Sequence, residues 1–132
     1  MVSSVVVPLG VGIDLVDVAR VERMLEGLGP RVMDRLLTDA ERAYCLSMAV
    51  PARHVAARIA AKEAAFKALQ PEDQRIAIGW REIEVERNDE GRPSLRLSGR
   101  AQERAEGLGV RRVMVSLSHS DLQAAAVVML LG

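Results

Sequence analysis

The chain has 132 residues, 49% of them hydrophobic and only 2% aromatic, so we expect one folded domain, residues 1–132, with an aliphatic core. Its 18 basic and 18 acidic residues cancel, and this balance, together with the scarcity of aromatic side chains, argues against a nucleic-acid partner. No apolar run approaches the ~20 residues of a membrane span, and the start of the chain does not resemble a signal peptide. We therefore expect a cytoplasmic protein with no membrane partner, whose thin core favours an oligomer.

The first part of the chain predicts a strand followed by a helix. Residues 5–13 are mostly apolar, and Gly12-Ile13-Asp14 is expected to open the helix with Asp14 as its N-cap. Apolar residues then recur at helical spacing up to Gly29-Pro30.

Two further helices are predicted before residue 70. One begins at Thr38, where Thr38 and Glu41 form a capping-box pattern, and ends before Pro51. The other spans residues 53–69 and contains seven alanines, whose small side chains allow neighbouring elements to approach closely. We expect this helix to lie at the centre of the fold.

The second part of the chain is mostly strand. Residues 82–86 alternate between polar and apolar, and a turn connects them to a partner strand at 93–97. A short helix is predicted at 100–108, and two strands at 113–117 and 124–131. The fold class is therefore α+β, with helices packed on a small antiparallel sheet.

The strongest chemical signal lies in the alanine-rich helix. At 100° per residue, Glu63 falls on an otherwise apolar stripe, where an isolated carboxylate is costly to bury. An ion pair with Lys67, a raised pKa or a metal ion would offset that cost. Taken alone, the ion pair is the simpler interpretation. Together, however, Asp14 and Glu63 offer two oxygen ligands for Mg²⁺.

A second candidate segment is Ser116-Leu117-Ser118-His119-Ser120, where a histidine leaves a strand among hydroxyl groups and could bind phosphate or transfer a proton. A plain polar turn explains this segment equally well. His54 has no such neighbours in sequence and is interpreted as a surface residue. Cys45 lacks an activating partner and is expected to be a core residue rather than a nucleophile.

Three segments, Gly12-Ile13-Asp14 with Arg20, the block from Arg58 through Lys62-Glu63-Ala64 to Lys67-Ala68, and 116–120, occur together in one order. In this combination the chain resembles the holo-acyl-carrier-protein synthases, the short-chain 4′-phosphopantetheinyl transferases. The resemblance runs from about residue 11 to 130 and includes the hairpin around residues 80–93. It implies the 4′-phosphopantetheinyl transferase-like fold.

The resemblance also implies a reaction and a set of site residues. Asp14 and Glu63 would bind Mg²⁺, and Lys67 would stabilise charge on the phosphates of coenzyme A, the substrate. A serine of an acyl carrier protein, from fatty-acid, polyketide or peptide synthesis, would attack the β-phosphorus, assisted by Glu63 or by a water on the metal, and 3′,5′-ADP would leave. The residues that would hold the phosphates of the coenzyme are Arg58, Lys62 and His119.

The resemblance also implies a symmetric homotrimer with active sites between neighbouring subunits. Arg20, Arg23 and Met24 on the first helix would contact the carrier. Without the resemblance, both arginines would be interpreted as part of a solvated face neutralised by neighbouring glutamates.

The chain departs from the family pattern at two places. Ile59 stands where an aromatic residue is usual, and residues 69–74 replace a glycine-rich stretch. The altered stretch is the one feature that favours the alternative function, a non-catalytic relative that binds carrier or nucleotide. A third interpretation is a Mg²⁺-dependent phosphohydrolase that uses the same two carboxylates.

Overall fold

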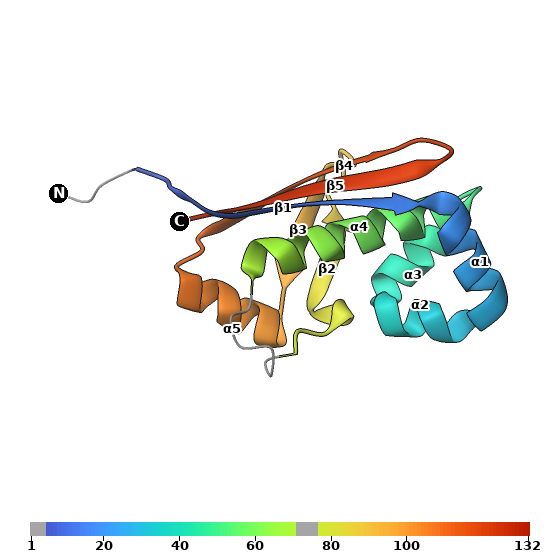
Figure 1. Cartoon of the computed structure of the whole chain (residues 1–132), viewed down its shortest axis with the longest axis horizontal. Coiled ribbons are helices and arrows are strands. Elements are labelled where there is room, and N and C mark those ends of the chain that lie inside the picture. Colours follow the sequence, from blue (N-terminus) through green and yellow to red (C-terminus); the bar gives the residue numbers. More distant parts are fainter. Residues whose placement is uncertain (1–4, 71–76) are drawn as a thin grey trace.

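The computed structural model describes residues 5–70 and 77–132. Its largest sheet is antiparallel, with the strand order β1 (Pro8–Asp17), β5 (Gln123–Leu131), β4 (Arg112–His119). This sheet lies across one long helix, α4 (Pro51–Leu69), as Figure 1 shows. The arrangement confirms the predicted α+β class.

Helix α4 forms the centre of the core, as its alanines predicted. Thirteen of its residues are buried, and it contacts β1 and β5 on one side and α1, α3 and β2 on others. Its contact with β1 is especially close, because Gly10 lies against Ala68 and Gly12 against Ala64. Small residues on both elements bring the backbones of strand and helix together.

Strand β1 extends farther than predicted, which corrects the expected position of Asp14. β1 pairs with β5 from Pro8 to Asp17, and Asp14 lies opposite Ala126 within the ladder. The following helix α1 (Val18–Leu28) begins after Asp17, so Asp14 is a strand residue and not an N-cap. The strand continues because β5 offers backbone partners along this whole length.

Helices α1, α2 (Pro30–Leu36) and α3 (Asp39–Leu46) lie together beyond one end of the sheet (Figure 1). Gly29-Pro30 ends α1 as predicted, but Pro30 also begins the unforeseen helix α2, since proline is well suited to a first helical position. The capping box of α3 is confirmed, with the Thr38 side chain accepting from the Glu41 N–H and the Glu41 side chain accepting from the Thr38 N–H.

The remaining elements form a smaller layer. A 3₁₀ turn, η1 (Trp80–Glu82), leads into the hairpin of β2 (Ile83–Arg87) and β3 (Pro93–Leu97), which is a separate two-stranded sheet. Helix α5 (Gly99–Leu108) follows, with the Glu82 carboxylate accepting from backbone N–H groups at its first turn. Among the described residues, no helix has the length and hydrophobicity to cross a membrane.

The three-stranded sheet has one face on α4 and an outer face that no other described element covers (Figure 1). Alternation along β1 places every second residue on that outer face. The exposed large apolar residues of the three strands are Leu9, Val11, Ile13, Leu15, Met114 and Val127. A surface of this kind is typical of a protein that associates.

Candidate active site

The structure brings Asp14 and Glu63 to one cavity. Asp14 faces inward from the middle of β1, and Glu63 comes from the face of α4 that packs beside this strand. Both line a cavity of about 280 Å³ whose wall also includes Ile59 and Trp80. Ile59, where the family usually has an aromatic residue, is therefore part of the cavity wall.

Lys67 lies one helical turn after Glu63 on α4 and contacts β1 at Asp14. Its Nζ donates to the Asp14 carboxylate at 3.1 Å and to the Ile13 carbonyl at 2.9 Å. In the described part of the chain, no ion pair connects Lys67 to Glu63, so the simpler intrahelical pair is not what this helix uses. The Lys67 ammonium remains exposed and accessible to an anion.

The electrostatics of the cavity set Glu63 apart. Burial raises the pKa of the Glu63 carboxyl, the negative charge of Asp14 raises it further, and Lys67 and Arg20 lower it. Within the described residues, no cluster of three or more metal-binding side chains occurs. The cavity thus offers two carboxyl groups, and that of Glu63 ionises less readily unless a cation lies nearby.

A larger groove of about 630 Å³ adjoins this cavity along α1 and α2. Met24, Leu36 and Trp80 line both hollows, so they form a shared wall. The groove is mostly apolar and carries two arginines, Arg31 and Arg35. Among the predicted carrier residues, Met24 lies in this groove, Arg20 lies in the carboxylate cavity, and Arg23 is exposed on α1.

Arg58 and His119 belong to a different place in the fold, near the start of α4. The His119 ring contacts the His54 ring, with centroids 5.4 Å apart, and His54 in turn contacts Tyr44 at 5.7 Å. The Arg58 guanidinium lies 4.4 Å from the centroid of Tyr44. The cavity that Arg58 lines shares no residue with the carboxylate cavity.

The sequence predicts a surface position for His54, and the structure corrects this. The side chain is half-buried in the cluster with Tyr44 and His119. Burial lowers the pKa of the His54 imidazole, and the neighbouring His119, Arg58, Arg87 and Arg53 lower it further. Its partners come from α3 and β4, so no local sequence pattern could have revealed them.

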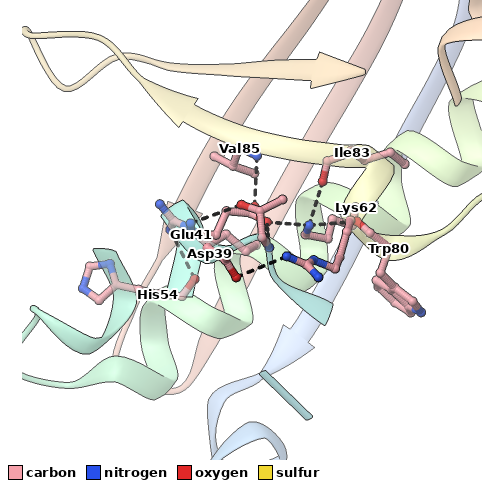
Figure 2. Close-up of polar contacts among 10 residues, drawn as sticks. Asp39, Glu41, His54, Lys62, Trp80, Ile83 and Val85 are labelled. Atoms are coloured by element: carbon pink, nitrogen blue, oxygen red, sulfur yellow. Dashed lines mark hydrogen bonds and ion pairs between the residues drawn. The ribbon is translucent and has the colours of Figure 1, made fainter. Parts of the chain in front are cut away.

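Lys62 does not fit its predicted role at the coenzyme. Figure 2 shows its ammonium enclosed between Glu41, the Trp80 carbonyl and the Ile83 carbonyl, at 2.7, 2.9 and 2.7 Å. All three N–H donors are used, and the side chain is fully buried. No donor remains for a phosphate, so the structure does not offer the Lys62 ammonium for the predicted role.

Glu41 and Trp80 are the residues that sequence reasoning does not assign to the site. The sequence identifies Glu41 only as part of a helix cap, because a buried lysine partner 21 positions away leaves no local signal.

Cys45 is fully buried as predicted, and desolvation raises the pKa of its thiol to about 11, which excludes a ready nucleophile.

Comparison with known proteins places this geometry in a family. Residues 10–127 match the 4′-phosphopantetheinyl transferase superfamily. The holo-acyl-carrier-protein synthase of Koribacter versatilis is 43% identical over 122 residues, which cover 92% of this chain and 97% of the relative.

Two crystal structures show the same fold. The holo-acyl-carrier-protein synthase of Neisseria meningitidis superposes with a TM-score of 0.84 at 28% identity, covering 94% of this chain and 98% of that one. The Bacillus anthracis enzyme, in complex with coenzyme A (3′,5′-ADP), has a TM-score of 0.77 at 32% identity, covering 95% and 97%. The chain therefore belongs to the 4′-phosphopantetheinyl transferase superfamily, among its holo-acyl-carrier-protein synthases.

Proposed function

We propose that this member of the superfamily transfers the 4′-phosphopantetheine arm of coenzyme A to a serine hydroxyl of an apo acyl carrier protein. The transfer requires Mg²⁺ and releases 3′,5′-ADP. The observation that carries the proposal is the cavity in which Asp14 and Glu63 meet beside Lys67. Coenzyme A in the Bacillus anthracis relative supports the choice of donor.

The donor set of the carboxylate cavity suits magnesium. Mg²⁺ prefers oxygen ligands and commonly takes one or two carboxylates, leaving the rest of its shell to water and substrate phosphates. Asp14 and Glu63 supply two carboxylates, and a divalent cation beside them would offset the burial and repulsion that raise the pKa of Glu63. When bound, the ion would neutralise charge on the diphosphate of the coenzyme.

The charged residues of the cavity then have separate tasks. The serine oxygen forms a bond to the β-phosphorus of coenzyme A, while the bond from that phosphorus to the bridging oxygen of 3′,5′-ADP breaks. Glu63 lines the cavity into which the carrier serine would enter, so we assign it the serine proton, taken directly or through a water molecule. Lys67, held by Ile13 and Asp14, stabilises negative charge on the phosphoryl group and the departing ADP.

Arg58 and His119 are the proposed anchors for the other phosphates of the coenzyme, and His54 joins them as a second imidazole. On one chain Arg58 lines a different cavity from Asp14 and Glu63, and the two histidines are in contact with each other and do not line the carboxylate cavity. An assembly of several copies would bring the two groups of residues together across a subunit boundary. The apolar outer face of the sheet supports such an assembly, and the family resemblance implies that it is a trimer.

The groove along α1 and α2 is the proposed docking surface for the carrier. Its apolar floor opens beside the carboxylate cavity, so a carrier seated there would present its serine to Glu63. Arg31 and Arg35, with Arg20 and Arg23 nearby on α1, would attract an acidic carrier surface.

We also place the enzyme in the cytoplasm, in keeping with a single free thiol.

The proposal is tested by intact-mass analysis of an apo carrier protein incubated with this protein, coenzyme A and Mg²⁺. We expect the carrier to gain one phosphopantetheine, with no gain in EDTA or with Glu63→Gln. No gain with fatty-acid or polyketide carriers would favour the non-catalytic alternative. That alternative rests on the stretch after Leu69, of which residues 71–76 lie outside the described residues. Product formed from coenzyme A without a carrier would instead indicate the phosphohydrolase.

A further inference from the structure

The buried Glu41–Lys62 ion pair is the strongest polar feature that the proposed chemistry does not use. The Lys62 ammonium and the Glu41 carboxylate are 2.7 Å apart, and both side chains are fully buried. Glu41 also accepts from the Thr38 N–H at 2.9 Å and the Val85 N–H at 3.0 Å. Every hydrogen of the ammonium and both oxygens of the carboxylate are therefore used.

This pair connects elements that form the walls of the site. Lys62 directly precedes Glu63 on α4, and its ammonium holds the Trp80 carbonyl at 2.9 Å (Figure 2). The Trp80 side chain lines both the carboxylate cavity and the groove along α1 and α2. It also packs edge-on against Phe66 of α4, with ring centroids 5.6 Å apart.

We propose that the Glu41–Lys62 pair is a positioning pair. It fixes the Glu63 carboxylate relative to Trp80, the residue that forms part of the wall of both the carboxylate cavity and the groove. A turn of α4 about its axis that released Lys62 would carry Glu63 with it, because the two residues are neighbours on one rigid helix. The same release would free the Trp80 carbonyl and let the shared wall move. The inference rests on the proposed function, since it assigns these residues a part in that reaction.

The test variant replaces both charges at once. Glu41→Gln with Lys62→Met removes the ion pair without leaving one charge buried alone, which either single substitution would do at a large cost in stability. The amide that replaces the Glu41 carboxylate would keep one oxygen acceptor, which can serve one of the two backbone N–H groups, of Thr38 and Val85, that the carboxylate now binds.

The matched control is Asp39→Asn with Arg81→Gln. This pair, 3.2 Å apart, connects α3 to η1, the two elements that Glu41 and the Trp80 carbonyl belong to, but both of its side chains are exposed. It therefore removes an exposed ion pair close to the buried one without changing the buried contacts.

Trp80 is the only tryptophan of the chain, so its fluorescence reports the position of the wall directly. In the double variant we expect Trp80 to be quenched by acrylamide at least about twice as strongly. The Mg²⁺ concentration for half-maximal transfer should rise about tenfold, as for other residues that orient metal ligands. The KM for coenzyme A should change little, and the control should match the wild type in all three measurements.

A folded double variant with wild-type quenching and wild-type Mg²⁺ dependence would overturn the inference, because the pair would then serve stability alone. Failure of the proposed function is distinguishable. If the wild type transfers nothing, Trp80 quenching and calorimetric titration of Mg²⁺ into protein with coenzyme A still test the positioning role. In that case, unchanged quenching and unchanged Mg²⁺ affinity in the double variant would also overturn it.

Discussion

Replacing Gly12 with alanine should disable the site while leaving most of the fold intact. An added Cβ would lie 1.9 Å from the Ala64 carbonyl oxygen and 2.8 Å from its carbonyl carbon, both backbone atoms of α4. Real Cβ atoms essentially never come within 3.0 Å of another atom, so β1 would have to move away from α4 by about 1 Å. Asp14 lies two residues farther along the same strand, and Glu63 directly precedes Ala64 on the helix. The shift would therefore separate the two carboxylates.

Two effects follow, and they differ in size. Overpacking of this kind costs about 1–3 kcal/mol, so the melting temperature should fall by roughly 3–10 °C and the variant should still fold. A displacement of about 1 Å in reacting groups can cost ~100-fold in rate, so kcat/KM for carrier modification should fall about that much.

Thermal unfolding and the intact-mass assay on the same preparation separate these two effects. Gly107→Ala is the control, because a Cβ there meets nothing within 4 Å and the residue lies on α5, away from the site. It should stabilise the protein by about 0.5–1 kcal/mol and leave the rate unchanged. A Gly12→Ala protein with wild-type kcat/KM would refute the claim that the β1–α4 contact sets the spacing of Asp14 and Glu63.

Three other changes test the electrostatics and the outer face. Glu63 has a raised pKa, so its protonated form stabilises the fold below the ordinary pKa of 4.5 and this contribution is lost as the pH rises through the raised value. Glu63→Gln should therefore be more stable than the wild type at pH 7, and chemical denaturation at pH 4 should show that gain shrinking. His54 has a lowered pKa, so the unfolded chain binds the extra proton first and stability should fall as the pH drops below 6.5. The melting temperature of His54→Gln should fall less than that of the wild type between pH 7 and 5; equal slopes would contradict the assignment. Val127→Asp on the outer face should convert the proposed trimer to a monomer in light scattering, and a mass unchanged from that of the wild type would mean that this face is not the interface.

Much of the fold was predictable because its signals are local. Alanine content predicted α4, the Thr38–Glu41 pattern predicted the start of α3, and period-two alternation predicted β2. The predictions were wrong where residues far away in the sequence determine the local structure. The end of β1 depends on how far β5 can pair with it, and the sequence around Asp14 does not indicate the length of that pairing. Proline after glycine ended α1 as predicted, but the same proline also starts α2.

The site was predictable to a similar extent. That Asp14 and Glu63 lie together was expected from two carboxylates that could share Mg²⁺ and from the family resemblance, whereas the partners of His54 and Lys62 were not expected. Both residues sit on α4, and their surroundings come from α3, β4 and the turn before β2. Helical periodicity tells which residues share a face, but it does not tell what lies opposite that face.

The two lysines of the chain show why this distinction matters. Five positions at 100° each place Lys67 about 140° around the helix from Lys62, while Glu63 and Lys67 differ by only about 40°. One helix can therefore present Glu63 and Lys67 to β1 and anchor Lys62 among α3 and β2. The position of Glu63 relative to Asp14 then depends on contacts on two sides of α4. On the side of β1, the absence of a side chain at Gly12 allows close contact, and on the side of α3, the Glu41–Lys62 pair holds the helix. If both contacts position the site, combining Gly12→Ala with the double variant should cost less than the sum of their separate effects on rate, because a displaced Glu63 can be displaced only once.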